Sequence, residues 1–481
     1  MIRREKQHSC PGCCLPLKPK GDVMPMEKNQ LVPLTITALS SGGCGVGRAG
    51  GMVVFVPYTA VGDELDAKIV QVRKHYAYGI IAALKRLGPG REAPVCPIYT
   101  KCGGCCFGHL SYEAELAAKQ QFVADAFSRL GGVDLPMRPI LPSPAPLRYR
   151  NKVQYPLAAD AEGHVRAGFY APRSHRVVPC ADCILQPALL NRIAATACRL
   201  LEQHCVPLYD EEQHTGFARH IYLRHAVTTG RVLFCLVANG RRLPHADAFC
   251  RDLAAAHPEV ESIVLNVNTA KTNVITGTEN LVLYGPGSLR DEMAGVPVEL
   301  DPLSFYQVNT AGAEQLYAVA REFSGLTGGE TLLDLYCGAG TIGLSMADAC
   351  GKLVGVEVVP AAVADAKRNA ARMGAGHAEF LCMDAGAAAR ELARRGLAPD
   401  VVIVDPPRKG CGPDALDPIL QMAPRRIVMV SCNPATAARD AAYLAGAYRV
   451  DAVQPVDMFP RTRHVECVIL LTADQNASRQ K

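Results

Sequence analysis

Four acidic residues stand at the ends of apolar, β-rich segments in the C-terminal part of the chain, namely Asp334, Glu357, Asp384 and Asp405. If these segments are parallel strands, their carboxyl ends meet along one edge of a sheet, where nucleotides bind. Glu357 is suited to bridging the two hydroxyls of a ribose, and Asp384 to accepting a hydrogen bond from an adenine amino group. The pattern therefore predicts a nucleotide site lined with carboxylates.

A glycine-rich turn follows Asp334. Gly338, Gly340 and Gly343 have the Gly-x-Gly-x-x-Gly spacing of dinucleotide sites, and the first two permit a tight turn and close approach of a ligand. The Asp334 carboxylate would repel a pyrophosphate, whereas it would attract the cationic methionine moiety of S-adenosylmethionine. Ordinary turn formation would explain Asp384 alone. The whole set favours S-adenosylmethionine over a nicotinamide.

A candidate nucleophile and a candidate base lie farther along the chain. Cys432 follows a fifth apolar segment within the sequence Ser-Cys-Asn-Pro, and Glu466 begins the apolar run near the C-terminus. With many cysteines present, an inert buried thiol is the simpler interpretation of Cys432. Likewise, Glu466 could be a surface residue of an edge strand. A cysteine at the carboxyl edge of the sheet would, however, lie beside the cofactor crevice.

Methylation of a pyrimidine needs both of these groups. Carbon 5 of uracil is a weak nucleophile, and a thiolate that adds at carbon 6 gives it enolate character. After methyl transfer, a general base must remove the proton from carbon 5 before the thiolate can leave. We therefore expect Cys432 to be the nucleophile and Glu466 to be the base.

The sequence around the strand-four acid disfavours the other nucleobases. Cytosine carbon-5 methyltransferases often place their cysteine directly after the Pro of this motif, but here Arg408 follows Pro407. Methyltransferases acting on adenine or guanine nitrogens usually have an aromatic residue after Pro-Pro, and it is missing too.

Composition indicates a folded, multidomain chain. Its 481 residues suggest about three domains of roughly 150 residues each. A hydrophobic content of 49% and a charged content of 20% exclude a disordered or fibrous protein. We find no secretory leader and no apolar run of about 18 residues, and so expect a soluble, cytoplasmic protein. In that setting, 20 cysteines indicate metal binding, catalysis or packing rather than disulfides.

Positive charge is concentrated in one part of the chain. The net charge is +5, but residues 138–242 contain 14 Lys and Arg against 7 Asp and Glu. This local excess predicts a polyanionic partner, such as RNA, for the middle of the molecule.

We expect an α/β protein with three domains after an extension at residues 1–26. Short β-rich runs at 27–86 predict a small antiparallel barrel, with a Gly-rich turn at 42–51. Residues 87–300 mix strands with helices at 111–130 and 189–204, and so predict an α+β domain. Residues 301–481 alternate Val- and Ile-rich strands with Ala-rich helices, which is typical of a doubly wound, Rossmann-like sheet.

Taken together, these motifs resemble the RNA uracil-5-methyltransferase family of the TrmA/RumA type. The resemblance extends from about residue 27 to residue 473. The sequences that carry it are Ser304-Phe-Tyr-Gln-Val-Asn, Asp334-Leu-Tyr-Cys-Gly-Ala-Gly, Asp405-Pro-Pro-Arg-Lys-Gly, Ser431-Cys-Asn-Pro and His464-Val-Glu.

The resemblance implies roles for particular residues. Cys432 and Glu466 match the nucleophile and base of the family. Residues 27–86 resemble a TRAM barrel, which the branch acting on transfer RNA generally lacks, so the resemblance favours a uridine of 23S ribosomal RNA as the target. The positions matching the family's contacts to S-adenosylmethionine are Gln307, Tyr336, Glu357, Asp384 and Asp405.

The cysteine-rich segment allows two metal sites. By spacing alone, the pairs Cys102/Cys105 and Cys180/Cys183 form a zinc ribbon, whereas Cys96, Cys102 and Cys105 with one distant partner suit a four-iron cluster. The resemblance favours the second, since the barrel-containing branch binds a [4Fe-4S] cluster through this pattern and one later cysteine, matched best by Cys183. It implies a structural role for the cluster.

Other interpretations remain open. The chain could act on transfer RNA, or be a non-catalytic RNA-binding factor for ribosome assembly, although its complete set of site residues argues against the latter. No Cys-x-x-x-Cys-x-x-Cys loop of a radical enzyme is present. Cys10, Cys13 and Cys14 form half of a metal knuckle, and Met24 or Met26 could be the true start. We expect a monomer without an obligate protein partner and without membrane contact.

Overall fold

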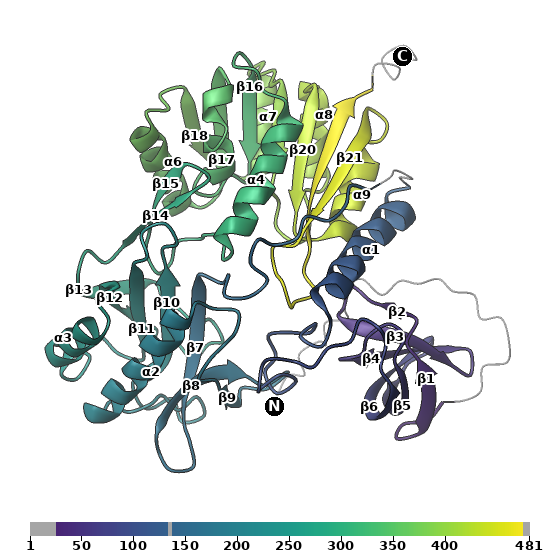
Figure 1. The fold of residues 1–481 in the computed structure, drawn as a ribbon. Helices are drawn as coiled ribbons and strands as arrows, with labels where there is room; N and C mark the ends of the chain where they lie inside the picture. Colours follow the sequence, from purple (N-terminus) through teal and green to yellow (C-terminus); the bar gives the residue numbers. More distant parts are fainter. Residues whose placement is uncertain (1–25, 133–136, 475–481) are drawn as a thin grey trace, which may run out of the picture.

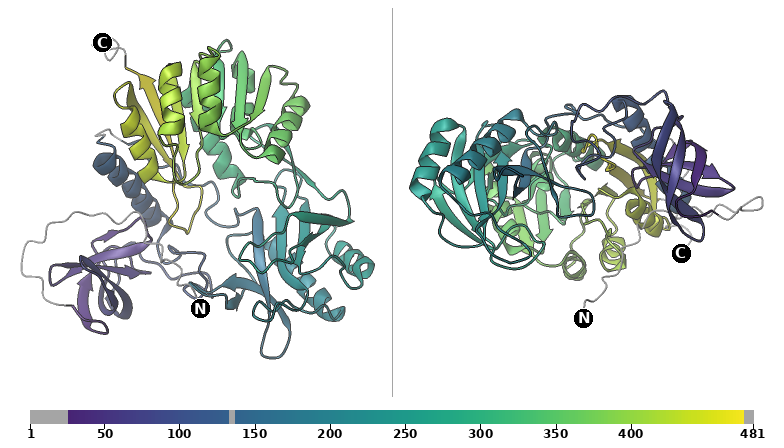
Figure 2. Two further views of the ribbon diagram at one scale, coloured as in Figure 1. Left: turned by 180° about the vertical axis from the view of Figure 1, so that it is seen from behind. Right: turned by 90° about the horizontal axis from the view of Figure 1, so that it is seen from below.

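The computed structural model describes residues 26–132 and 137–474. A small β-barrel (purple) and a central mixed domain (teal) lie at opposite sides of the molecule, and a larger C-terminal domain (green to yellow) lies above them (Figure 1). Figure 2 shows the same division from behind and from below. Nearly all of the expected extension, including Cys10, Cys13 and Cys14, falls outside the described residues. None of the described helices has the length and apolar character needed to cross a membrane.

The N-terminal barrel is a six-stranded sheet with the strand order β1-β5-β6-β4-β3-β2. Its pairs are antiparallel except β4 with β6, which is parallel. Val32 and Leu34 of β1 alternate with exposed residues and enter the barrel core. The strands are β1 (Leu31–Thr35), β2 (Ala38–Leu39), β3 (Cys44–Ala49), β4 (Met52–Pro57), β5 (Glu64–Val72) and β6 (Tyr76–Arg86).

Most of the Gly-rich stretch expected to be a turn at residues 42–51 is strand β3. Two of its glycines are there for space: a Cβ at Gly45 would lie 1.9 Å from the Thr59 hydroxyl, and one at Gly47 would lie 2.9 Å from the Thr35 carbonyl. Glycine is therefore needed here because it allows close packing within the barrel. In the sequence, the same glycines look like turn residues.

The central domain is built on a seven-stranded sheet with the order β13-β12-β11-β10-β7-β8-β9, in which only β11 and β12 are parallel. Helices α2 and α3 contribute to the same core as this sheet, as the expected α+β organisation requires. The elements are β7 (Lys152–Ala159), β8 (Val165–Tyr170), β9 (Val177–Pro179), α2 (Ala188–Gln203), β10 (Ala218–His225), β11 (Val232–Ala238), α3 (Ala246–Ala256), β12 (Val260–Val267) and β13 (Glu279–Tyr284), followed by the hairpin β14 (Leu289–Met293) and β15 (Val296–Leu300).

The C-terminal domain has the expected doubly wound architecture. Its sheet has the order β18-β17-β16-β19-β20-β22-β21, in which the first five strands are parallel and β22 runs antiparallel to both β20 and the edge strand β21. The strands are β16 (Thr331–Leu335), β17 (Lys352–Glu357), β18 (Ala378–Cys382), β19 (Val401–Val404), β20 (Arg426–Ser431), β21 (Tyr448–Val456) and β22 (Glu466–Ala473).

Helices cover both faces of this sheet. One core contains α4 (Thr310–Ser324), α5 (Thr341–Leu344) and α6 (Pro360–Met373), and the other contains α7 (Ala385–Arg394), α8 (Pro413–Met422) and α9 (Pro434–Leu444). Helix α1 (Tyr112–Leu130) also belongs to the second core through Val123 and Phe127. Although its sequence lies within 87–300, this helix packs on the C-terminal domain.

Candidate active site

The register of the parallel strands brings three of the predicted acids together. Asp334 of β16 pairs with Gly355 of β17 and with Ile403 of β19. Glu357 and Asp405 lie two residues beyond these partners, so they flank Asp334 at the carboxyl edge of the sheet. This is the edge at which open α/β sheets bind nucleotides.

Asp334 is buried and only partly satisfied. Its Oδ2 accepts a hydrogen bond of 3.0 Å from the Gly343 amide, while its Oδ1 has no partner among the described residues. Burial, together with the neighbouring carboxylates of Asp405 and Glu357, raises the pKa of Asp334 to about 7. An orphaned carboxylate oxygen in an acidic, buried setting fits a cationic ligand such as the methionine moiety of S-adenosylmethionine.

The turn after β16 has the backbone conformation that its sequence requires. Gly338 and Gly340 have φ angles of 55° and 78°, and Tyr336 also lies in the left-handed region with a φ of 66°. A Cβ at Gly340 would lie 3.0 Å from the ring of Phe380. Both the turn and the close packing therefore depend on glycine at this point.

Glu357 and Asp384 already have structural partners. Glu357 accepts hydrogen bonds from the amides of Gly338 (3.1 Å) and Val359 (2.9 Å), which fixes its carboxylate beside the glycine turn. Asp384 is the N-cap of α7 and accepts a hydrogen bond from the Ala387 amide. Since a carboxylate can accept several hydrogen bonds, these contacts orient both side chains and leave their expected ligand roles as predictions.

Gln307 lies near the same edge, close to a residue that the sequence did not single out. The Tyr317 hydroxyl is near the Gln307 side chain and lies 3.0 Å from Thr341 Oγ1. Tyr317 is buried in helix α4, near Asp334 and Asp405. An inward-facing tyrosine at helical spacing looks like an ordinary core residue in a sequence, so no pattern marks this role.

Cys432 and Glu466 come together at one end of β20 and β22. The antiparallel pairing of Ser431 with Cys467 places Cys432 opposite Glu466. Burial raises the pKa of Glu466 to about 8, with a further contribution from Asp405. Burial also raises the pKa of Cys432 to about 11, and Glu466 adds to this shift. The two groups, which are predicted to act at different steps of one reaction, are thus close enough for Glu466 to influence the pKa of Cys432.

Arg408 is the cation of this cluster. It lies near Cys432 and Glu466 and lowers the pKa values of both against the effect of burial. Its Nη2 also lies 3.3 Å from Nδ1 of His464, whose pKa is lowered to about 4 by burial and by nearby cations. The sequence drew attention to Arg408 only as an argument against cytosine, and its position beside the thiol was not predicted.

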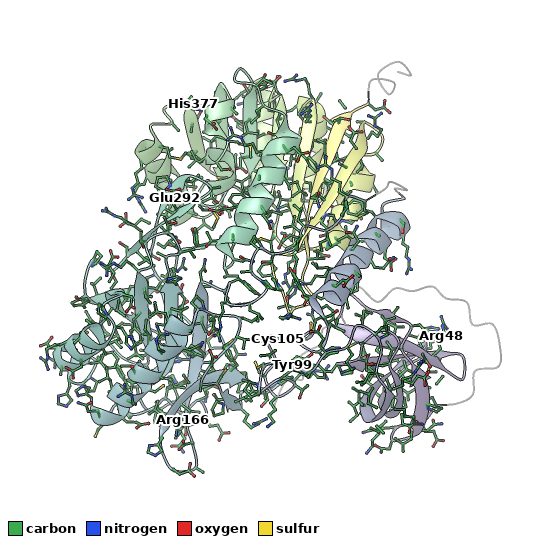
Figure 3. All side chains as sticks on the ribbon, in the orientation of Figure 1. Arg48, Tyr99, Cys105, Arg166, Glu292 and His377 are labelled. Carbon is green, nitrogen blue, oxygen red and sulfur yellow. The ribbon has the colours of Figure 1, made fainter. Side chains whose placement is uncertain are left out.

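The predicted metal-binding cysteines line one cavity. A cavity of about 350 Å³ is bordered by Cys96, Cys102, Cys105, Cys180 and Cys183 and extends to His464. Burial and the nearby Cys183 raise the pKa values of Cys96, Cys102 and Cys105. Figure 3 labels Cys105 and Tyr99 in this segment, between the barrel and the central domain.

The chemistry of the cavity fits an anionic occupant. Arg150 and Lys152 line it beside the cysteines, and Nε of Arg150 is buried with no partner in the described part of the chain. Within residues 26–132 and 137–474, however, no three His, Cys, Asp or Glu side chains are placed to hold a metal ion. Both the iron-sulfur cluster and the zinc ribbon therefore remain predictions.

Two exposed surfaces offer contacts for a polyanion. Arg73, Lys74 and His75 are exposed at the hairpin between β5 and β6. Behind them the partly exposed rings of Tyr76 and Tyr78 lie 5.6 Å apart. In the central domain, Arg166, Arg173 and Arg176 are exposed around the β8–β9 connection. Cations beside stackable rings are the features that hold RNA.

Comparisons with known proteins place the chain among RNA methyltransferases. The family model described as tRNA (Uracil-5-)-methyltransferase matches residues 298–474, and the TRAM domain model matches residues 25–82. An uncharacterized RNA methyltransferase of Bacillus cereus is 40% identical over 93% of this chain and 98% of its own length. One from Clostridium tetani is 40% identical over 94% of this chain and 98% of its own.

A solved structure is similar over nearly the same extent. The tRNA (uracil-54, C5)-methyltransferase of Pyrococcus abyssi, in complex with S-adenosyl-L-homocysteine, has a TM-score of 0.73 and a sequence identity of 29%. The match covers 92% of this chain and 99% of that one. The likeness therefore includes the barrel, the central domain and the methyltransferase domain together.

Proposed function

The chain belongs to the RNA uracil-5-methyltransferase family, and we propose that it methylates carbon 5 of a uridine in 23S ribosomal RNA with S-adenosylmethionine as methyl donor. The coarser activity, that of an S-adenosylmethionine-dependent RNA methyltransferase, follows from its relatives. The observation that carries the proposal is the pairing of Cys432 and Glu466 at one end of neighbouring strands, beside the carboxylate-lined cofactor edge.

The proposed reaction assigns one task to each residue. The Cys432 thiolate adds to carbon 6 of the uracil, which creates an enolate and makes carbon 5 nucleophilic. S-adenosylmethionine, when bound, supplies the methyl group that carbon 5 accepts. Glu466 then takes the proton from carbon 5, and the electrons of the broken C–H bond restore the C5–C6 double bond as the thiolate leaves.

Arg408 and Asp334 support these steps. The cation of Arg408 favours the thiolate form of Cys432, which the neighbouring carboxylates of Glu466 and Asp405 disfavour. The orphaned oxygen of Asp334 provides an electrostatic partner for the donor's cationic end. Gln307, Tyr336, Glu357, Asp384 and Asp405 are the further proposed cofactor contacts, with Gly338 and Gly340 forming the turn.

Two RNA substrates are candidates, namely ribosomal RNA and transfer RNA. The resemblance to the barrel-containing branch of the family favours ribosomal RNA. The similar archaeal structure is named as a transfer RNA enzyme although the match includes the barrel, which makes transfer RNA the second candidate. Mapping 5-methyluridine in ribosomal and transfer RNA from a deletion strain decides between them. A deletion strain with all such sites intact in both RNAs would instead favour a non-catalytic assembly factor.

We also propose that Cys96, Cys102, Cys105 and Cys183 bind a [4Fe-4S] cluster. Support comes from their shared cavity and from the cations Arg150 and Lys152, which would balance the charge of a thiolate-bound cluster. Its role would be structural, since the four thiolates would leave no iron free to bind substrate. Protein purified anaerobically should absorb broadly near 400 nm and contain about four irons per chain. Colourless protein with one zinc, lost in Cys180→Ser but not in Cys96→Ser, would show the zinc ribbon instead.

A further inference from the structure

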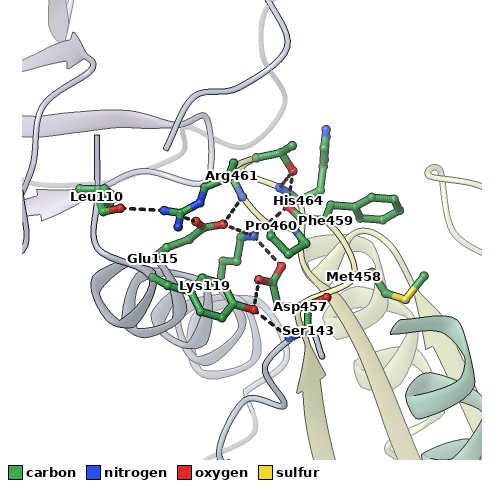
Figure 4. Close-up of polar contacts among 12 residues, drawn as sticks. Leu110, Glu115, Lys119, Ser143, Asp457, Met458, Phe459, Pro460, Arg461 and His464 are labelled. Carbon is green, nitrogen blue, oxygen red and sulfur yellow. Dashed lines mark hydrogen bonds and ion pairs between the residues drawn. The ribbon is translucent and has the colours of Figure 1, made fainter. Parts of the chain in front are cut away.

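A fully buried ion network joins helix α1 to the loop before β22 (Figure 4). Lys119 Nζ donates to Glu115 Oε1 at 2.7 Å and to Asp457 Oδ1 at 2.6 Å, and all three side chains have an exposure of 0%. The Tyr112 hydroxyl donates to the other oxygen of Asp457 at 2.9 Å. None of these groups has a task in the proposed reaction.

The network also makes hydrogen bonds to the loop that leads to Glu466, the proposed base. This loop runs from Asp457, directly after β21, to Val465, directly before Glu466. Lys119 Nζ donates to the Phe459 carbonyl at 3.1 Å, and Glu115 Oε1 accepts from the Arg461 amide at 2.7 Å. One lysine and one glutamate of α1 therefore hold the loop by its backbone as well as by Asp457.

Further hydrogen bonds fix the same half of the loop. Asn309 Nδ2 donates to the Met458 carbonyl at 3.0 Å, and the Tyr149 hydroxyl donates to the Pro460 carbonyl at 3.0 Å. The Arg461 carbonyl accepts from the amide of Cys106 at 3.0 Å, beside the cysteine-lined cavity. The first five loop residues are thus tied to their surroundings, and the loop then leads to His464 and Glu466.

Stability alone does not explain such a network. Buried ion pairs lose hydration that their mutual attraction only partly restores, and well-packed apolar residues often replace them without loss of stability. Directional bonds from one ammonium group to a carboxylate and to a backbone carbonyl do, however, define where a loop sits. The geometry therefore indicates that the network fixes the position of the loop.

We propose that Lys119 is a positioning residue for Glu466, which it orients toward the substrate by holding the loop at 457–461. This proposal rests on the proposed function, because it assumes that Glu466 removes the proton from carbon 5. If the loop shifts, addition of Cys432 and methyl transfer still occur, but removal of the proton slows. The effect of losing Lys119 should therefore fall on one late step of the reaction.

The test is Lys119→Met in the full-length protein, with an RNA oligonucleotide that the wild type methylates. We expect kcat to fall by about 10-fold or more, within the range that general-base catalysis supplies, while KM for RNA and affinity for S-adenosylmethionine stay within about threefold. We also expect a denaturant-stable complex of enzyme with methylated RNA to accumulate, visible as a slow band on a denaturing gel. Arg129→Met is the matched control, since Arg129 is a half-exposed cation on the same helix that pairs with Asp125.

A merely structural role would lower activity without trapping the intermediate. Wild-type turnover in Lys119→Met, or abolished turnover without a covalent complex, overturns the proposal. If Lys119→Met fails to bind S-adenosylmethionine, then Asp457→Asn decides by the same two readouts, since it keeps the size of the side chain. Failure of the wild type to form a complex with 5-fluorouridine RNA would instead contradict the proposed function itself.

Discussion

Cys432 and Glu466 face each other because Ser431 and Cys467, their neighbours in sequence, form a register pair between β20 and β22. The sheet register therefore places the proposed nucleophile opposite the proposed base, and the loop at 457–465 leads directly into Glu466. In addition, the pKa of each is raised by burial and by the proximity of negative charge. At neutral pH the site therefore favours the neutral forms of both groups.

The first prediction concerns the nucleophile. Cys432→Ala should abolish methylation, because carbon 5 then lacks activation from a carbon 6 adduct. Affinity for S-adenosylmethionine should stay within about threefold of wild type, since the thiol meets the base and not the cofactor. Tritium transfer to RNA and calorimetric titration measure the two quantities. Substantial residual turnover would exclude Cys432 as the nucleophile.

The second prediction concerns the base. Glu466→Gln should still add to the uracil and transfer the methyl group, but it cannot accept the proton from carbon 5. Enzyme should therefore accumulate in a covalent complex with methylated RNA that survives denaturant, as it should for wild type on 5-fluorouridine RNA, because fluorine cannot leave as a cation. If Glu466→Gln forms no such complex, another group is the base.

The third prediction follows from the pKa of Glu466, which burial raises from 4.5 to about 8. The folded state therefore binds this proton more tightly than the unfolded state, so its contribution to stability is complete below about pH 4.5 and is lost as the pH rises to about 8. Glu466→Gln cannot ionise, so this variant does not lose stability in this way as the pH rises. Its Tm should exceed that of wild type by roughly 2 °C or more at pH 8.5 but not at pH 5. Equal Tm differences at both pH values would contradict the shift.

The fourth prediction assigns thiol activation to Arg408. Because its guanidinium lowers the pKa of both Cys432 and Glu466, Arg408→Met should raise both. The rate of covalent trapping by 5-fluorouridine RNA should then fall at neutral pH and recover as the pH increases, with its midpoint displaced upward by about one unit. Arg408→Lys keeps the charge and is the matched control. An unchanged pH profile in Arg408→Met would show that Arg408 serves only in packing.

Local patterns were enough to predict most of the fold. Strands β16 to β20 are apolar runs separated by Ala-rich helices, and their strand-end acids meet because parallel register is regular. Strand β3 was not predicted, because its glycines look like turn residues in the sequence. In the structure they are required because a side chain would collide with neighbouring atoms. The parallel pairing of β4 with β6 depends on contacts between distant segments, which no local pattern encodes.

Contacts that rely on long-range packing were not predicted. Glu115 and Lys119 have the i, i+4 spacing of an exposed pair on a solvated helix face, and only the distant Asp457 reveals that they are buried. Arg408 likewise reaches Cys432 from another strand end. In both cases the residue type is visible in the sequence, but its surroundings come from the tertiary fold.

The last prediction concerns how the barrel binds RNA. Replacing Arg73 and Lys74 by alanine should weaken RNA binding at moderate salt and lower the slope of log K against log salt by about 0.7–0.9 for each phosphate that the protein no longer neutralises. Affinity for S-adenosylmethionine should not change, because the hairpin between β5 and β6 is remote from the sheet that forms the cofactor edge. Lys85→Ala is the control, since Lys85 is also a barrel cation but pairs with Asp66 at 2.6 Å. Filter binding at several salt concentrations measures the slopes. An unchanged slope in the double variant would show that the hairpin does not bind the phosphate backbone and that the central arginines bear that role.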